Sequence, residues 1–121
     1  MGMAWLSKNT ENVEKYKADP LCGFMFTVNA YFHMFSGMIK MNHSEHEGKA
    51  AKTLPILFVS GKEDLVGDCG KAVEHVYKKY KNNRYKDVRI KLYEGDRHEI
   101  LNELDREVVF EDILGWLENR K

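Results

Sequence analysis

Two side chains in the second half of the sequence are of the types that together activate a hydroxyl nucleophile. Asp64 ends the run Gly-Lys-Glu-Asp at residues 61–64, and His98 ends the run Gly-Asp-Arg-His at residues 95–98. A carboxylate paired with an imidazole fixes its tautomer and stabilises the imidazolium, while the imidazole takes a proton from a nucleophilic hydroxyl. The two residue types therefore predict the acid and the base of nucleophilic catalysis, provided that the fold brings them together.

The segments before these two runs predict the strands that would do so. Residues 54–60 (LPILFVS) form a continuous apolar run, typical of a strand buried on both faces, and residues 87–93 (DVRIKLY) alternate in polarity. Residues 68–81 have helical spacing, so the two strands should lie parallel with a right-handed crossover. Because neighbouring strands lie about 4.8 Å apart, Asp64 and His98 are expected to meet above their carboxyl ends.

The remaining elements complete an α/β fold class. A closing helix is expected over residues 101–119, with an inward stripe made of Val109, Ile113, Trp116 and Leu117. In the first half, a short helix over residues 10–17 begins at Thr10, which can cap it. A longer aromatic helix over residues 27–41 follows, and residues 42–52 are polar enough to predict a loop.

The sheet expected from this chain is incomplete. The apolar run 54–60 has the composition of a central strand, yet the sequence offers it a single evident neighbour, the strand at 87–93. Parallel sheets are normally covered on both faces and seldom consist of two strands. We therefore expect further strands upstream of this sequence, or else self-association through the exposed sheet edge.

No nucleophile is predicted within the chain. Serine hydrolases of the α/β type carry their serine in a G-x-S-x-G elbow between a strand and a helix, and this motif is absent from the 121 residues. Ser36 and Ser60 each precede a glycine, but the first lies in a helical pattern and the second ends a buried strand.

Other kinds of site have weaker support. His43 and His46 form an H-x-x-H pair without a third ligand pattern, so we expect neither a metal nor a cofactor. Lys plus Arg and Asp plus Glu number 19 each, and a net charge of zero provides no field to attract nucleic acid. Cys22 and Cys69 lack metal or disulfide spacing, and the sequence shows no signal peptide or transmembrane run. A cytoplasmic protein is the expectation.

Two segments make the sequence similar to a known family. LPILFVSGKEDLVGDCGKAV and VRIKLYEGDRHEILNELDREVVFEDILGWL resemble the end of monoacylglycerol-lipase and lysophospholipase-like α/β hydrolases, often labelled serine aminopeptidase-like. The resemblance implies the C-terminal part of an α/β-hydrolase fold, with cap-region helices and a loop at 1–52 and a β-α-β-α core portion at 53–121. Asp64 matches the triad acid and His98 the triad base, although Leu65 stands where many relatives have proline.

The resemblance implies a truncated part of a serine hydrolase that cleaves carboxylic esters, with lipid esters such as lysophospholipids or monoacylglycerols as substrates. This chain would supply the triad Asp and His without the serine, and would be inactive alone. A peptidase of the same fold is one alternative. The other is a non-catalytic fragment that associates with another chain through its sheet edge. The aromatic helix at 28–39 would form either core or the wall of an acyl pocket.

Overall fold

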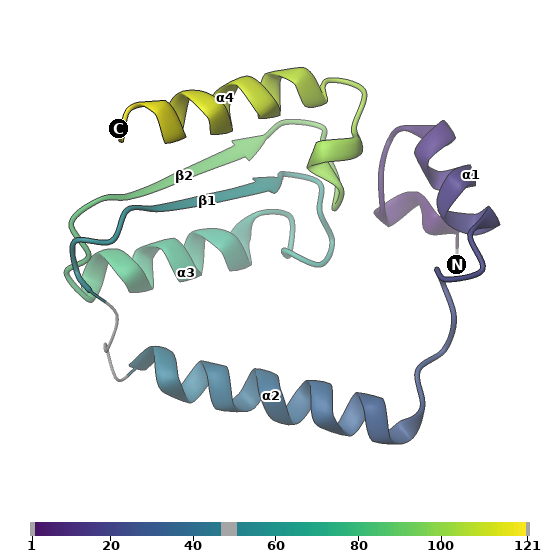
Figure 1. The fold of residues 1–121 in the computed structure, drawn as a ribbon, viewed down its shortest axis with the longest axis horizontal. Helices are drawn as coiled ribbons and strands as arrows, with labels where there is room; N and C mark the ends of the chain where they lie inside the picture. The colour runs from purple at the N-terminus through teal and green to yellow at the C-terminus, as the bar shows by residue number, and fades with distance from the viewer. Residues whose placement is uncertain (1, 47–50, 121) are drawn as a thin grey trace.

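The structure is a computed structural model, and it describes residues 2–46 and 51–120. Four α-helices, two strands and two short 3-10 helices follow one another along the described chain (Figure 1). In order they are η1 (Met3–Trp5), α1 (Thr10–Ala18), α2 (Val28–His46), β1 (Ile56–Gly61), α3 (Lys71–Asn82), β2 (Val88–Tyr93), η2 (Ile100–Asn102) and α4 (Arg106–Glu118).

The two strands form a parallel pair, as the sequence predicts. Their register runs from Ile56 opposite Val88 to Gly61 opposite Tyr93, so both carboxyl ends reach the same edge of the sheet. Helices α3 and α4 lie on opposite sides of the strands, while α1 and η1 stand near the carboxyl ends (Figure 1). This arrangement brings the loops that carry Asp64 and His98 to one place.

A small apolar core lies between the sheet and α4. Tyr93, Ile100 and Val109 are buried together, and Val59 and Ile113 pack against them. Within the expected stripe of the closing helix, Val109 is fully buried and Ile113 and Trp116 are half-buried. Leu117 was expected to face inward, but it is 52% exposed. The core therefore involves the first turns of α4 more than its end, because the two-stranded sheet covers only part of the helix.

The helices that follow the two strands begin later than predicted. Helix α3 starts at Lys71 instead of residue 68, since Asp68, Cys69 and Gly70 have φ of 50°, 50° and 83°, which an α-helix cannot contain. The predicted closing helix 101–119 is divided into η2 and α4, and Glu103 lies between them with its side chain buried. At residues 68–70 and at residues 103–105, turns therefore replace what the spacing predicted as helix.

Two predictions for the first half are wrong in detail. Residues 42–46, expected in a loop, continue α2 to His46, and residues 47–50 of that predicted loop lie outside the described residues. Thr10 is not the cap of α1: the side chain of Asn9 accepts hydrogen bonds from the amides of Glu11 and Asn12. Asparagine and threonine are both good caps, and here the chain geometry selects the asparagine.

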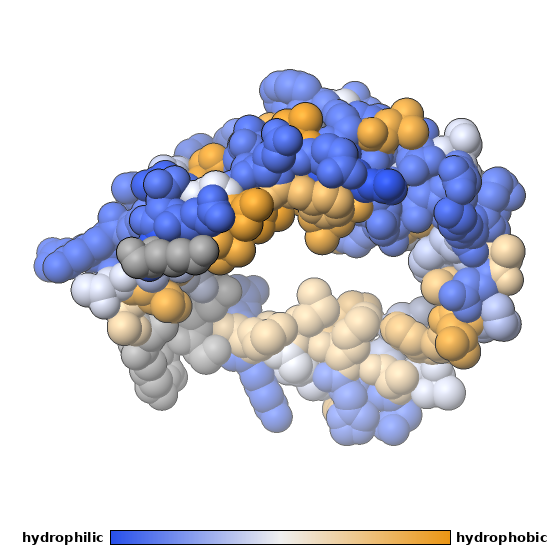
Figure 2. Space-filling view, turned by 45° about the horizontal axis from the view of Figure 1, so that its top comes forward, coloured by the Kyte–Doolittle hydropathy of each residue, from blue (hydrophilic) through white to orange (hydrophobic). Residues whose placement is uncertain are grey.

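Helix α2 stands apart from the sheet and exposes most of its apolar side chains. The exposed set on this helix is Val28, Tyr31, Phe32, Met34, Phe35, Met38, Ile39 and Met41. Figure 2 shows an open gap between this helix and the sheet-bearing part, with apolar side chains on both walls. Among the described residues, no helix combines the length and the apolar character required to cross a membrane.

Gly61 permits the closest backbone approach in the site region. A Cβ added at this position would lie 2.2 Å from the carbonyl oxygen of Arg97 and 2.3 Å from that of Asp96. Both oxygens belong to backbone, which cannot move aside as a flexible side chain would. The loop that carries His98 therefore passes directly over the end of β1 only because residue 61 has no side chain.

We predict that Gly61→Ala destabilises the chain by about 1–3 kcal/mol, because the new methyl group must push the loop away from β1. Gly115→Ala in α4 is the matched control, since a Cβ there meets nothing within 4 Å. The control should stabilise the chain by up to about 1 kcal/mol through helix propensity. Urea unfolding followed by circular dichroism measures both; equal effects of the two substitutions would contradict the close approach.

Candidate active site

Asp64 lies in the loop between β1 and α3, which we call the acid loop (residues 62–70). Asp64 is 6% exposed, and one of its carboxylate oxygens, Oδ1, accepts a hydrogen bond from the amide of Val66 at 2.8 Å. The carbonyl of Asp64 accepts from the amide of Cys69 at 2.8 Å, which closes the turn. These bonds fix the carboxylate and leave its second oxygen, Oδ2, to face the neighbouring loop.

His98 lies in the loop between β2 and η2, which we call the histidine loop (residues 94–99). Its Nδ1 lies 3.1 Å from Asp64 Oδ2, and its side chain is 40% exposed. The predicted proximity of the two side chains is confirmed. Because the carboxylate can only accept, Nδ1 carries the proton, and Nε2 is left as the nitrogen that can take a proton from a nucleophile.

Backbone hydrogen bonds join the two loops beneath this pair. The amide of Glu63 donates to the carbonyl of Asp96 at 2.8 Å. The carbonyl of Tyr93, the last residue of β2, accepts from the amides of Lys62 at 2.8 Å and Asp96 at 3.3 Å. The two side chains therefore extend from loops whose separation is fixed by main-chain contacts rather than by the Asp–His bond itself.

The N-terminal segment brings a lysine cation to a buried carboxylate of the histidine loop. Lys8 Nζ lies 2.5 Å from Asp96 Oδ1 and 3.0 Å from Asp105 Oδ1. Asp96 is fully buried, and this burial raises the pKa of its carboxyl group in spite of the lysine. The hydrogen bond to Asp96 raises the pKa of Lys8, and the hydrogen bond to Lys8 lowers the pKa of Asp105.

Sequence reasoning missed these groups and the aromatic neighbour of His98. The ring of Trp5, in η1, lies 5.3 Å from the imidazole ring of His98 at an interplanar angle of 51°. Lys8 and Trp5 belong to a segment without periodicity or motif, about 90 residues from the loop that they contact. No local signal in the sequence distinguishes them from surface residues.

The serines considered at the sequence level occupy the elements expected for them. Ser60 lies in β1, is buried, and donates from its hydroxyl to the carbonyl of Gly61 at 3.3 Å. Ser36 lies within α2 and is half-buried. Neither stands on a turn between a strand and a helix, the setting in which an elbow serine acts.

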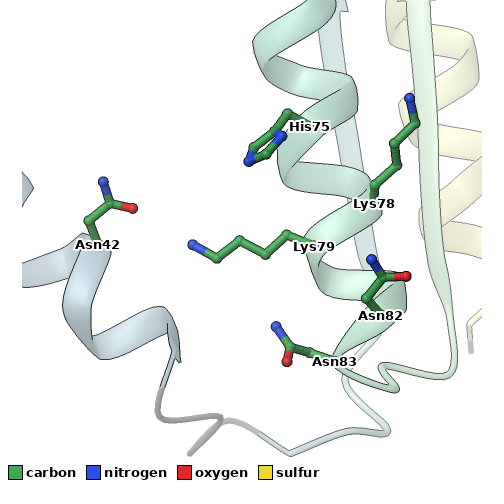
Figure 3. Close-up of a pocket in the computed structure, with 6 residues that line it drawn as sticks. All are labelled: Asn42, His75, Lys78, Lys79, Asn82 and Asn83. Atoms are coloured by element: carbon green, nitrogen blue, oxygen red, sulfur yellow. The ribbon is translucent and has the colours of Figure 1, made fainter.

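Among the hollows on the described part of the chain are a large one beside α3 and a smaller one that adjoins the pair. The larger, about 610 Å³, lies between α2 and α3 and is lined by Asn42, His75, Lys78, Lys79, Asn82 and Asn83 (Figure 3). A hollow of about 360 Å³ is lined by Ala4, Trp5, Glu63, Leu65, Cys69 and Arg97. Glu63, Leu65 and Arg97 neighbour Asp64 or His98 in sequence, and Trp5 contacts His98, so the smaller hollow lies beside the pair.

We predict that Lys8→Met destabilises the chain by about 3 kcal/mol at neutral pH, because it leaves the buried carboxylate of Asp96 without its cation. The raised pKa of Asp96 means that its charged form is disfavoured in the folded state, so stability increases as the pH falls through that pKa. The cost of Lys8→Met should therefore shrink towards acid pH.

The double variant Lys8→Met/Asp96→Asn tests the assignment of that cost. Removing the charge of Asp96 should restore most of the lost stability, and the pH dependence of the loss should disappear with it. Urea unfolding at neutral and at acid pH measures these differences. A loss that is independent of pH and persists in the double variant would show that the lysine acts through its packing alone.

Comparisons with known proteins agree with this architecture. A family model described as serine aminopeptidase, S33, matches residues 1–105. A monoacylglycerol lipase of Mycolicibacterium smegmatis is 30% identical over 115 residues, which are 93% of this chain and 38% of that protein.

Two solved structures share the fold, and the chain spans less than half of each. The monoacylglycerol lipase of Paleococcus ferrophilus has a TM-score of 0.74 at 22% identity, covering 97% of this chain and 43% of its own. A thermostable carboxyl esterase from Bacillus coagulans, in complex with glycerol, has a TM-score of 0.81 at 26% identity, covering 95% and 38%. The described part of the chain has part of an α/β-hydrolase fold, and with a family model matching most of its length, the chain belongs to the serine aminopeptidase S33 family.

Proposed function

We propose that Asp64 and His98 are the acid and the base of a catalytic triad in a serine hydrolase that cleaves carboxylic esters. The observation that carries the proposal is the distance of 3.1 Å between Asp64 Oδ2 and His98 Nδ1 above the ends of two parallel strands. Reactive groups of open α/β sheets gather at that edge. The acid precedes the histidine in the chain, which is the order of α/β hydrolases.

The serine in this mechanism comes from a G-x-S-x-G segment outside the 121 residues. As its hydroxyl attacks the ester carbonyl, His98 Nε2 takes the hydroxyl proton, and Asp64 stabilises the imidazolium and holds its tautomer. The ester C–O bond breaks, the imidazolium protonates the departing alcohol, and an acyl-enzyme remains. Water then attacks the acyl group while His98 Nε2 takes its proton. The bond between the acyl carbon and the serine oxygen breaks, the imidazolium returns the proton to that oxygen, and the carboxylic acid leaves.

Lipid esters, of the lysophospholipid or monoacylglycerol type, are the proposed substrates. Two of the similar proteins are named monoacylglycerol lipases and one a carboxyl esterase. Residues 1–52 act as the cap region in this proposal, with the exposed apolar side chains of α2 forming part of an acyl pocket. The portion 53–121 contributes the core. Cys22 and Cys69 are free, which supports a reducing, cytoplasmic setting.

A peptidase of the same fold is the alternative within this class, because the family description names an aminopeptidase. Both activities use the same acid and base, so they differ only in the acyl and leaving groups accepted. Hydrolysis of p-nitrophenyl esters without cleavage of aminoacyl p-nitroanilides favours the esterase, and the reverse result favours the peptidase.

We predict that the 121-residue chain alone shows no ester turnover, because acid and base have no positioned nucleophile to activate. In a chain extended by its serine-bearing segment, Asp64→Asn and His98→Gln should each lower kcat for p-nitrophenyl butyrate by at least about 10³-fold. The matched controls are Asp68→Asn in the same loop and His75→Gln on α3, both exposed. Their kcat should remain within about twofold of the unmodified enzyme.

Two results would contradict this assignment. One is ester hydrolysis by the purified 121-residue chain that a serine-directed phosphonate abolishes, which would place the nucleophile within this chain and require Ser60 and Ser36 to be examined again. The other is an extended, folded enzyme in which Asp64→Asn and Asp68→Asn have equal effects. The controls Asp68→Asn and His75→Gln make the same changes of residue type, so they separate a loss of catalysis from a general loss of structure.

The second candidate function is association with another chain through the sheet edge, including self-association. The amides of Ile56 and Lys62 donate to the carbonyls of Asp87 and Tyr93, on the β2 side. Because successive amides of a strand point in opposite directions, those of Leu57, Val59 and Gly61 face the open edge of β1. Unpaired strand amides of this kind pair readily with another strand.

We predict that the isolated chain self-associates at micromolar concentration, and that Leu57→Pro weakens the association because it removes an edge amide without a bond to β2. Phe58→Pro is the comparison, since by the same alternation its amide faces β2 and its loss should unfold the sheet. Sedimentation equilibrium with circular dichroism measures both effects. A monodisperse monomer with a cooperative thermal transition would rule out the edge as an interaction surface.

A further inference from the structure

The carboxylate of Glu103 is buried in the turn between η2 and α4 and is surrounded by hydrogen-bond donors. Glu103 has no exposed surface. Oε1 accepts from the amides of Arg97 at 3.0 Å and Lys8 at 3.1 Å. Oε2 accepts from the hydroxyl of Ser7 at 2.8 Å and the amides of Lys8 at 3.0 Å and Asn9 at 3.3 Å. One carboxylate thus binds both the N-terminal segment and the histidine loop.

Together with the acid loop, this carboxylate fixes one peptide group beside His98. The amide of Arg97 donates to Glu103, and the carbonyl of Asp96, on the other side of the same peptide bond, accepts from Glu63. A planar peptide held at both its N–H and its C=O cannot rotate. This peptide precedes His98 by one residue, and Glu63, which donates to its carbonyl, precedes Asp64 by one residue. The orientation of the peptide therefore determines the direction in which the imidazole extends.

Glu103 also fixes the N-terminal segment that contacts the imidazole. By binding Ser7, Lys8 and Asn9 it holds the chain that follows η1, in which Trp5 lies against His98. The guanidinium of Arg97 adds to this, donating to the carbonyl of Ala4 at 2.6 Å. The imidazole thus contacts both Asp64 and an indole whose position depends on Glu103.

We propose that Glu103 is the positioning residue of the catalytic histidine, holding His98 in the orientation and tautomer in which Nδ1–H faces Asp64. This inference rests on the proposed function of the Asp64–His98 pair. Glu103 touches neither the imidazole nor a substrate group; it acts through the Arg97 amide and through the N-terminal segment. A carboxylate is required because four donors point at its two oxygens, and an amide side chain would direct its own N–H groups at some of them.

The test measures the imidazole tautomer of His98 in the ¹⁵N-labelled 121-residue chain by long-range ¹H–¹⁵N correlation, at a pH where the ring is neutral. His98→Asn identifies the signals. In Glu103→Gln the ratio of the Nδ1–H to the Nε2–H form should fall at least about threefold, since complete loss of a hydrogen bond to a charged group changes an equilibrium by about tenfold or more. Ser7→Ala, which removes one donor to Glu103, should produce a smaller change in the same direction.

Val109→Ala and Asp64→Asn make the outcomes distinguishable. Val109 is buried in the core and has no bond to the histidine loop, so its truncation should lower stability and leave the tautomer ratio unchanged. If Asp64→Asn leaves the ratio unchanged, the pair itself does not form and the proposed function fails. If Asp64→Asn lowers the ratio while folded Glu103→Gln does not, the positioning role alone is overturned. Should Glu103→Gln not fold, an unchanged ratio in Ser7→Ala overturns the role instead.

Discussion

The geometry of the candidate site depends on how closely the histidine loop can approach the end of β1. At Gly61 the backbone carbonyls of Asp96 and Arg97 occupy the space that a side chain would fill. This approach allows the amide of Glu63 to bond the Asp96 carbonyl, and that main-chain bond sets the distance at which Asp64 and His98 meet. Parallel pairing brings the two loops to the same edge, but the missing Cβ determines how near they come.

Two carboxylates in the same region are buried away from water and therefore need partners within the protein. Asp96 and Glu103 are both fully buried within a few residues of His98, and they have different partners: in the described part of the chain Asp96 is bonded through Oδ1 and its Oδ2 has no hydrogen bond, whereas both oxygens of Glu103 accept hydrogen bonds. Asp96 has the lysine cation of Lys8, whereas Glu103 has amides and one hydroxyl. Buried carboxylates are costly unless they are paired or fully hydrogen-bonded, so both require the N-terminal segment to be in place. The fold of residues 7–9 and the order of the histidine loop are therefore coupled.

Away from the site, the molecule exposes surfaces that are more apolar than a small domain normally leaves in water. Two parallel strands form the sheet in the described residues, and the exposed side chains of α2 include phenylalanines, methionines and an isoleucine. Such surfaces are costly to hydrate, since about 25 cal/mol is lost for each Å² of apolar area that stays wet. Relatives in which this chain spans 38–43% of the length have additional polypeptide that can cover the corresponding surfaces.

The sequence by itself determined the elements whose signals are local. An apolar run predicted the first strand and an alternating pattern the second, their connection by a helix predicted parallel pairing, and the polar turns after them predicted where Asp64 and His98 would meet. Helix starts were less predictable, because positive φ at residues 68–70 and the buried Glu103 override helical spacing. The tertiary structure alone decided the contacts of Lys8, Gly61 and Glu103. Their partners lie as many as 97 residues away in the chain, and a charged residue that will be buried by such a partner has the same local pattern as one that remains in solvent.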